Sequence, residues 1–355
     1  MSWQPNPFLH VETESIYNPL TDRTLRFGEE GFELLRRMVG AEWPAASQAE
    51  LSELESNGWI VSQGKDLSRQ SHLRIVSLET STVCNQACYF CPVSIAPRED
   101  VTMTGSLFDD IVTQLMSFRQ TLQSVFLQSY NEPTIDRRFV EQCRALMSAD
   151  LPVAVLSNGS GLTAAKVDAL IEGGGLRYLA INLSTLDRER YAAERGGDHL
   201  AMVLRNLDYL KGLPLAEQMN MVVLGTGNET HQRDYEAIRD RFAGSRFEVQ
   251  HHVVMDRAGW LDIGLHAASP KRRLAGCDNI GSRPIQHLHI TPKGTCVLCC
   301  EDYDENYVVG DLRTATISEV LAGPELARMR RWVYGIEEAP EDFMCRKCIF
   351  ARTRE

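Results

Sequence analysis

One short segment organises this sequence: Thr80-Ser81-Thr82-Val83-Cys84-Asn85-Gln86-Ala87-Cys88-Tyr89-Phe90-Cys91-Pro92. Its three cysteines have C-x3-C-x2-C spacing and follow the apolar run 73–78, which we expect to be a strand. A strand therefore delivers three thiols on one tight loop. Three soft ligands can hold three corners of an iron–sulfur cube, which leaves the fourth iron free to bind a small chelating molecule. A metal position without a protein ligand is a reactive position, as it is in catalytic zinc sites.

Two other interpretations of these cysteines are a structural zinc knuckle and separate core thiols. Zinc would need a fourth ligand. The nearest histidine before the loop is His72, and no Cys or His follows soon after the loop. We therefore favour the iron–sulfur cluster.

The composition limits the classes of function. The chain has 355 residues, which is enough for two or three domains, and its net charge of −11 argues against a nucleic-acid partner. No apolar run reaches transmembrane length, and the N-terminus does not resemble a signal peptide. Ten cysteines in such a chain are expected to be metal ligands or catalytic thiols rather than disulfides. We expect a cytoplasmic protein with no membrane or nucleic-acid contact.

Residues 1–70 are expected to form a small separate α+β domain. Its expected elements are two short strands within 15–27, helices at 31–39 and 47–56, and a short wing strand at 59–61. This order resembles the winged-helix peptide-recognition element of many enzymes that modify ribosomal peptides. The alternative is a packing domain that only covers the rest of the chain.

Strand and helix patterns alternate through residues 71–260. The expected strands are 75–79, 124–128, 153–157, 178–183, 219–224 and 247–254, and the expected helices are 105–118, 137–147, 164–172, 201–210 and 230–242. Such alternation with short connections predicts a parallel, barrel-like α/β sheet. Six units are too few for a closed eight-stranded barrel.

The cysteine spacing, with Phe90 directly before the third cysteine, resembles the signature of radical S-adenosylmethionine (radical SAM) enzymes. Six units match their partial (β/α)6 barrel, whose chemistry lies at the carboxyl ends of the strands. The resemblance implies that Cys84, Cys88 and Cys91 bind a 4Fe–4S cluster, and that S-adenosylmethionine binds the open iron. One electron, from a donor such as flavodoxin or ferredoxin, would cleave that cofactor to methionine and a 5′-deoxyadenosyl radical, which abstracts a substrate hydrogen atom.

Candidate cofactor ligands follow the second and third expected strands. Gln128-Ser129-Tyr130-Asn131-Glu132-Pro133 is similar to the family's Gly-Gly-Glu motif followed by proline, which receives the methionine amino group, although Tyr130 and Asn131 stand where the family has glycines. Glu132 would pair with the ammonium, or would be an acid at a helix start. Asn158 lies in a segment that resembles the family's Thr-Asn-Gly turn, and Asn-Gly is also a turn signal in its own right.

Two further candidates follow the fourth and sixth expected strands. Asn182-Leu183-Ser184-Thr185-Leu186-Asp187, with Arg195-Gly196 after it, resembles a segment whose serine faces the cofactor's carboxylate or ribose. Ser184 is therefore a candidate ligand, or else the N-cap of the next helix. Arg257 lies in a stretch that resembles an Asn-Arg-Ala-Gly sequence of relatives, and would touch cofactor or substrate, or form a surface salt bridge.

The alternation of strand and helix patterns stops at about residue 261, and residues 261–355 contain a second set of cysteines. Cys277 comes first. A hairpin with its turn at 292–294 follows, then short helices near 317–321 and 325–332, and finally the C-x2-C pair of Cys345 and Cys348. Such a pair with two more cysteines can fill all four corners of a second cluster, or a tetrahedral zinc site.

This layout resembles the SPASM/Twitch extension of radical SAM enzymes, which has a cysteine, then Gly-x4-Cys, then C-x2-C. The resemblance implies one auxiliary 4Fe–4S cluster held by four cysteines, namely Cys277, Cys299, Cys345 and Cys348. The full SPASM form needs more cysteines than exist here, so the shorter Twitch form is the better match. Strand alternation is expected to put Cys299 and Cys300 on opposite faces, with Cys300 as the substitute ligand.

The remaining thiols are Cys143, Cys296 and Cys300. Cys143 is expected in the middle of a helix, where a cysteine packs as a small apolar residue. Cys296 or Cys300 would be a hydrogen-atom donor to a substrate radical, as single cysteines are in radical SAM epimerases.

The resemblance implies a net two-electron oxidation, because the auxiliary cluster would accept the electron left on the substrate radical. It offers two substrate classes: a ribosomal peptide, oxidised or cross-linked while residues 1–70 grip its leader, or a small alcohol, sugar or cyclitol, oxidised or epimerised. We favour the peptide because of the N-terminal domain. The non-enzymatic alternative is a metal-cluster scaffold protein, which would not cleave S-adenosylmethionine.

Overall fold

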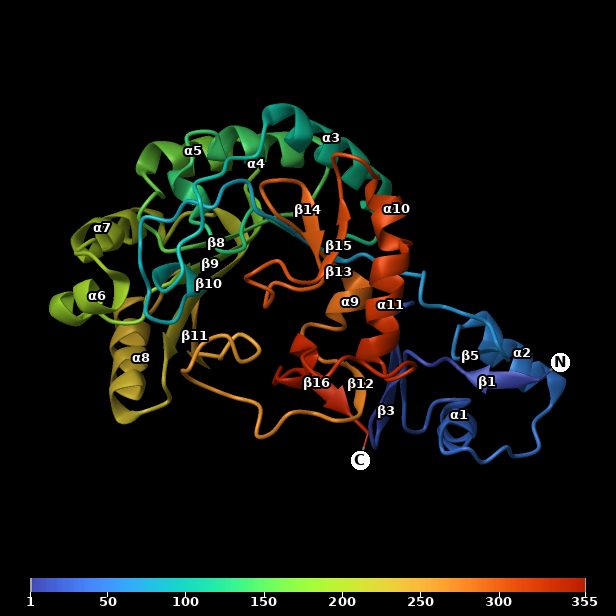
Figure 1. Cartoon of the computed structure of the whole chain (residues 1–355). Helices are drawn as coiled ribbons and strands as arrows, with labels where there is room; N and C mark the ends of the chain where they lie inside the picture. Colours follow the sequence, from blue (N-terminus) through green and yellow to red (C-terminus); the bar gives the residue numbers. More distant parts are fainter. Residues whose placement is uncertain (1, 355) are drawn as a thin grey trace.

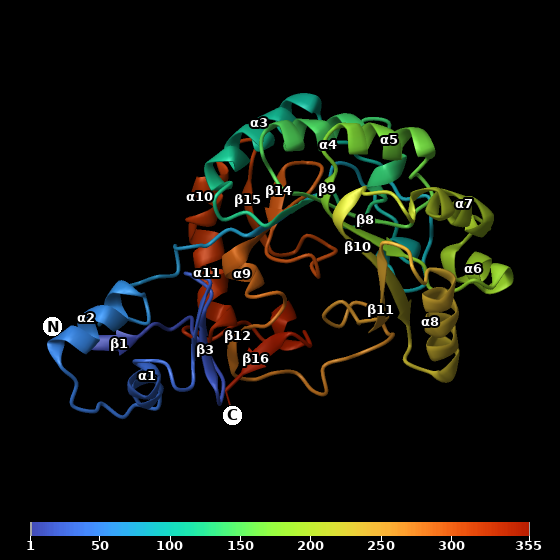
Figure 2. The same cartoon turned by 180° about the vertical axis from the view of Figure 1, so that it is seen from behind.

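A partial barrel of six parallel strands forms the centre of the computed structural model, which describes residues 2–354 (Figures 1 and 2). The strands are β6 (Ile75–Leu78), β7 (Ser124–Phe126), β8 (Val153–Ser157), β9 (Leu176–Asn182), β10 (Ala216–Gly225) and β11 (Phe247–Val253). Each pairs in parallel with the next, and β11 ends the sheet as an edge strand. The predicted six-unit partial barrel is therefore confirmed.

Helices cover the outer face of this sheet, as both views show (Figures 1 and 2). They are α3 (Gly105–Leu115), α4 (Phe139–Ser148), α5 (Ala164–Glu172), α6 (Arg188–Arg195), α7 (Leu200–Leu210) and α8 (Glu229–Arg241). The helix α6 was not among the expected helices, because its sequence RERYAAER has little apolar periodicity. It forms because Asp187 caps its start by accepting from the main-chain N–H of Arg190, and Gly196 (φ 72°) ends it.

The C-terminal region continues the barrel sheet. Strand β13 (His287–Ile290) pairs in parallel with β6, and β14 (Thr295–Val297) and β15 (Val308–Asp311) follow in antiparallel order. The expected hairpin turn is present, with Gly294 at φ 84°. The remaining elements here are β12 (Leu274–Cys277), α9 (Arg283–Gln286), α10 (Ile317–Leu321), α11 (Pro324–Val333) and β16 (Ala351–Thr353). One hydrophobic core consequently runs from the barrel into the C-terminal region.

The N-terminal region has a small core of its own and packs on the C-terminal region. Its elements are β1 (Trp3–Pro5), β2 (His10–Val11), β3 (Ser15–Asn18), β4 (Arg23–Arg26), α1 (Phe32–Val39), α2 (Gln48–Ser56) and β5 (Ile60–Ser62). A 2.8 Å hydrogen bond joins the ring of His10 to the hydroxyl of Tyr334, and the amide of Gln286 donates to the hydroxyl of Tyr17 at 2.7 Å. The region therefore lies beside α11, β12 and β16 (Figures 1 and 2). Its winged-helix interpretation stays a prediction.

None of the helices within residues 2–354 is both long and apolar enough to span a membrane.

Candidate functional site

The cysteine loop after β6 is held in place by main-chain contacts. The N–H groups of Ala87 and Tyr89 donate to the carbonyls of Arg195 and Glu194 at the end of α6, at 2.9 and 3.0 Å. The residue after Arg195 is Gly196, and only glycine fits there. A Cβ at this position would lie 2.8 Å from the Cβ of Ala87, which is closer than two carbon atoms can pack. The end of α6, which follows the fourth barrel strand, therefore supports the loop that carries the thiols.

Cys84, Cys88 and Cys91 line a cavity of about 270 Å³ at the carboxyl ends of the barrel strands. Burial raises the pKa of the Cys84 thiol to about 12, and a hydrogen bond from the main-chain N–H of Gln86 lowers it. Burial likewise raises the pKa of Cys91, whose sulfur accepts from the N–H of Val93. These N–H groups point at sulfur and would stabilise a thiolate that binds metal, so the loop fits a cluster.

Six of the seven candidate cofactor ligands line the same cavity; they are Phe90, Tyr130, Asn131, Glu132, Asn158 and Arg257. These six residues come from four segments that are far apart in the sequence, and the fold brings them together. The seventh, Ser184, lies behind the wall and is buried.

Glu132 is an acid at the start of a helical turn, and its pairing with the cofactor's amino group stays a prediction. Its buried carboxylate caps the turn Pro133–Ile135, where it accepts from the N–H and hydroxyl of Thr134. It also accepts from the hydroxyl of Ser157 at 2.8 Å and the N–H of Asn158 at 2.5 Å. Burial raises the pKa of this carboxyl, and the hydrogen bonds lower it. The group is thus fixed in position on the cavity wall.

Ser184 is not a helix cap, since Asp187 caps α6, so that alternative was wrong. Its hydroxyl accepts from the guanidinium of Arg195 at 2.9 Å and from the N–H of Leu224 at 3.2 Å. Ser184 therefore positions Arg195 at the cavity.

Arg195 is a site residue to which the sequence analysis gave no role. It is 2% exposed, lines the cavity, donates to the sulfur of Cys88 at 3.4 Å and lies over the ring of Phe90 at 4.9 Å. The only signal in the sequence was its place after the segment resembling the serine motif. A charged residue at the end of a polar helix gives no pattern that would reveal that it points inward.

Tyr130 and Arg257 connect this cavity to the C-terminal region. The hydroxyl of Tyr130 donates to the carbonyl of Cys300, and the guanidinium of Arg257 lies over the Tyr130 ring at 5.8 Å. Arg257 also pairs with Glu301 at 3.4 Å, and the Glu301 side chain is only 4% exposed. The surface salt bridge considered for Arg257 was therefore wrong, because its partner is buried.

A second cavity is lined by Cys277, Cys299, Cys345 and Cys348, all four predicted auxiliary ligands. The antiparallel pairing of β12 with β16 sets Cys277 opposite Ala351, next to the C-x2-C pair. The other lining residues are mostly apolar; they include Leu298, Val333, Met344 and Phe350. Burial raises the pKa of Cys277, and the main-chain N–H groups of Asn279 and Arg283 donate to its sulfur. The donor set fits a cluster with four protein ligands.

The prediction that Cys299 and Cys300 lie on opposite faces was wrong. Strand β14 ends at Val297, so strand alternation no longer applies two residues later. Both sulfurs contact the guanidinium of Arg283, and only Cys299 lines the second cavity.

The other two thiols lie in the core. Cys143 is fully buried within α4, which confirms its packing role. Cys296 is fully buried on β14 and lines neither cavity, which argues against it as a hydrogen donor. Across residues 2–354, no three His, Cys, Asp or Glu side chains are gathered closely enough to hold a single metal ion.

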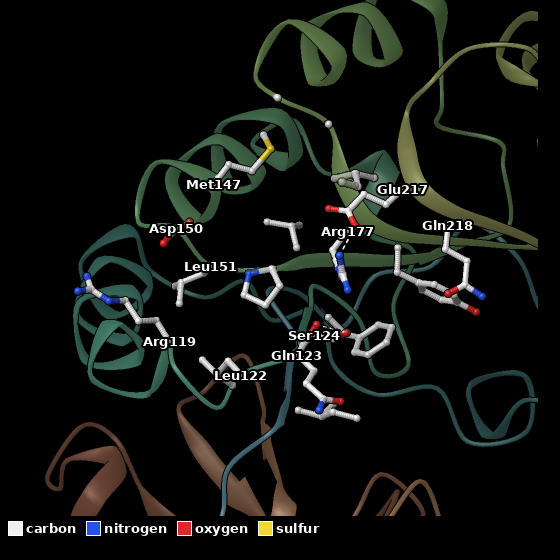
Figure 3. A pocket seen from close by; sticks show the side chains of 18 of the residues that line it. Arg119, Leu122, Gln123, Ser124, Met147, Asp150, Leu151, Arg177, Glu217 and Gln218 are labelled. Atoms are coloured by element: carbon white, nitrogen blue, oxygen red, sulfur yellow. Dashed lines mark hydrogen bonds and ion pairs between the residues drawn. The ribbon is translucent and has the colours of Figure 1, made fainter.

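A larger hollow, about 1170 Å³, opens at the amino ends of the strands (Figure 3). Arg177 and Glu217 form an ion pair on its wall, and Arg119, Gln123 and Asp150 lie around it. None of the candidate ligands lines it. We therefore place the chemistry at the smaller cavity, where the thiols are.

Comparison with known families agrees with this placement. The model of the radical SAM superfamily matches residues 78–238, and that of the SPASM iron–sulfur cluster-binding domain matches residues 277–349. The protein is therefore a radical SAM enzyme with a C-terminal SPASM domain, and its cofactors are 4Fe–4S clusters and S-adenosylmethionine.

Individual relatives are distant. A probable GTP 3′,8-cyclase of Pyrococcus abyssi (strain GE5 / Orsay) is 28% identical over 161 residues, which span 45% of this chain and half the length of that relative. Streptococcus suis SuiB bound to S-adenosylmethionine has a TM-score of 0.58 at 13% identity, covering 93% of this chain and 90% of SuiB. BtrN in complex with AdoMet and 2-DOIA has a TM-score of 0.51 at 17% identity, covering 76% of this chain and 90% of BtrN. The two solved structures are similar to this chain in fold.

Proposed function

We propose that this enzyme oxidises or cross-links a ribosomally made peptide by radical SAM chemistry. Cys84, Cys88 and Cys91 would hold the first 4Fe–4S cluster and leave one iron for S-adenosylmethionine. When bound, that cluster supplies the electron that cleaves S-adenosylmethionine and so starts hydrogen abstraction from the substrate. The observation that carries the proposal is that these three thiols share one cavity with the candidate cofactor ligands.

The chain's own residues would bind and orient S-adenosylmethionine. Arg195 offers a buried cation, held by Ser184, for the cofactor's carboxylate. Glu132, fixed by its four hydrogen bonds, offers a carboxylate for the amino group. Phe90 and Tyr130 form an aromatic part of the cavity wall and would exclude water from the cavity.

The second cavity would hold one auxiliary cluster that accepts the electron left on the substrate. Its support is the contact between the sites: Tyr130 lines the first cavity and bonds to the carbonyl of Cys300, and Arg257 reaches Glu301, which lines the second. Substrate oxidation and electron acceptance would therefore take place side by side. The electron that starts the reaction would come from a donor such as flavodoxin or ferredoxin.

A peptide substrate is supported by the N-terminal region. We propose domains at 1–70, 71–260 and 261–355, with the first as the leader-binding part. SuiB in complex with its precursor peptide SuiA has a TM-score of 0.57 at 12% identity and covers 99% of this chain. The hydrogen bonds of His10 and Tyr17 join the region to the SPASM domain, where a bound leader would present its core to the barrel mouth.

A small alcohol, sugar or cyclitol is the second candidate substrate. The observation that favours it is the single set of four thiols around the second cavity, which matches one auxiliary cluster rather than two. Oxidation at a hydroxyl carbon needs no leader and would use the same two sites.

The test is anaerobic reconstitution with iron and sulfide, reduction, and incubation with S-adenosylmethionine and candidate substrates. We expect 5′-deoxyadenosine together with a peptide that has lost two hydrogens. Full-length enzyme with small peptides encoded beside its gene is the first arm, and sugars and cyclitols are the second. An enzyme that holds iron but forms no 5′-deoxyadenosine would overturn the proposal and favour a scaffold protein.

A further inference from the structure

Arg283 is a cation with an unusual set of partners. It is the first residue of α9 and lines the second cavity. Its guanidinium donates to the sulfurs of Cys299, at 3.8 Å, and Cys300, and these are its only side-chain hydrogen bonds among the described residues. Its Nε atom is buried and has no partner.

Arg346, an arginine in the same region, has oxygen partners for its guanidinium donors. It lies inside the C-x2-C pair, yet its donors go to the carbonyls of Pro340, Lys271, Arg272 and Ala339 and to the carboxylate of Glu338. Arg346 thus holds the loop that carries two thiols and points away from their sulfurs. Arg283 does the opposite and points at sulfur.

Arg283 also reaches the other side of the cysteine set through its main chain. Its N–H donates to the sulfur of Cys277, while its side chain lies against Cys299. One residue therefore contacts two of the four candidate ligands, which come from segments 22 positions apart along the chain (277 to 299).

The Arg283 guanidinium is partly buried, and such a cation needs a negative partner, since an unpaired charge away from water is strongly unfavourable. An uncharged thiol does not supply that charge, and the Glu301 carboxylate, which also lines the cavity, pairs with Arg257 instead. A cluster held by four thiolates carries net negative charge, so a cluster bound by these cysteines would supply the negative partner that the Arg283 guanidinium requires.

We propose that Arg283 is the built-in counter-ion of the auxiliary cluster and raises its reduction potential. This rests on the proposed function, in which the second cavity holds a 4Fe–4S cluster. The reduced cluster carries one more negative charge than the oxidised one, so a fixed cation beside its sulfurs stabilises the reduced form more. A higher potential makes the cluster a better acceptor for the electron released by the substrate.

The experiment isolates the auxiliary cluster in a Cys84→Ala, Cys88→Ala, Cys91→Ala background. Iron and sulfide are counted, and a redox titration followed by electron paramagnetic resonance gives the midpoint potential. Arg283→Gln removes the charge, and Arg283→Lys keeps it. Arg352→Gln is the matched control, because Arg352 pairs with Asp278, next to Cys277, but also with Glu12 of the N-terminal region.

We expect Arg283→Gln to lower the reduced-to-oxidised ratio at a fixed potential by about tenfold, a shift of about 59 mV for one electron. Arg283→Lys and Arg352→Gln should stay within about threefold of the parent, by the same relation. If Gln loses its iron while Lys keeps it, the need for a positive charge is equally supported.

Two results would overturn the inference: an unchanged midpoint in Arg283→Gln, or equal loss of iron in the Gln and Lys variants, which would assign Arg283 a shape-based role. Failure of the proposed function looks different. It would appear as an absence of iron and sulfide in the background protein itself, before Arg283 is changed, and the inference would fall with it.

Discussion

The two cysteine sites differ in how the chain builds them. The three thiols at the barrel mouth come from one loop of eight residues, Cys84 to Cys91, and share a cavity with charged and polar side chains. The four thiols of the second site come from three segments: β12 and its partner β16 bring Cys277 next to the C-x2-C pair, and Cys299 follows β14. The rest of their cavity is mostly apolar. A site with a missing ligand and polar walls suits the binding and cleavage of a cofactor. A site with all four thiols and apolar walls suits electron storage.

The variant expected to separate the two sites most clearly is Cys88→Ala. Cys88→Ala should abolish 5′-deoxyadenosine formation, because two thiols cannot hold the cluster, while about four irons per chain stay bound at the second site. Iron counting and chromatography of the reaction products measure both effects. Cys143→Ala is the control, since that thiol is buried in α4 and should leave both unchanged. Retained 5′-deoxyadenosine formation in Cys88→Ala would contradict the ligand assignment.

The complementary change is at the second site. Cys345→Ala should lower iron from about eight to about four per chain and still allow S-adenosylmethionine cleavage, but with little oxidised product, because the electron acceptor is missing. Product and 5′-deoxyadenosine are measured in the same reaction. Cys300→Ala should keep the full iron content, since Cys300 does not line the second cavity. Iron loss in Cys300→Ala and not in Cys299→Ala would exchange the two assignments.

The difference between the sites also explains what the sequence could predict. The three thiols of the first site could be grouped from their spacing, because they are local in sequence, and they line one cavity in the structure. The barrel strands were found because parallel strands buried on both faces form short apolar runs, such as Val153–Ser157. The pairing of β13 with β6 could not be predicted, because nothing in either segment specifies a partner more than two hundred residues away.

Residues whose role depends on where their side chains point could not be predicted from the sequence either. Arg195 points inward from α6, a polar helix with too few apolar residues to mark its buried face. Cys299 and Cys300 lie beyond the end of β14, so strand alternation does not apply to them. Tyr130, which stands where relatives have glycine, was identified from the motif. Its contact with the carbonyl of Cys300 depends on tertiary structure that no local pattern contains.

Arg195 allows the first site to be weakened without removing its thiols. Arg195→Gln should raise the KM for S-adenosylmethionine by roughly 10- to 100-fold, because a hydrogen bond to a charged group contributes about 1.5–3 kcal/mol. Iron content should not change. Arg190→Gln is the control on the same helix, since Arg190 pairs with Asp234 and does not line the cavity. An unchanged KM would remove Arg195 from the cofactor site, and loss of iron would make it a support of the cysteine loop instead.

The smallest change tests whether the two sites work together. Tyr130→Phe keeps the ring that lines the first cavity and removes only the hydroxyl that donates to the carbonyl of Cys300. A hydrogen bond of this kind contributes about 1 kcal/mol, so we expect the ratio of oxidised product to 5′-deoxyadenosine to fall by roughly fivefold. Tyr178→Phe is the control, because its hydroxyl accepts from Asn220 at 3.0 Å and its side chain lines the hollow at the opposite end of the barrel. The ratio isolates coupling from cofactor cleavage, since a change confined to the first site would lower both products equally. An unchanged ratio would mean that the hydroxyl contact only packs the two regions together, and that the electron reaches the second site without its help.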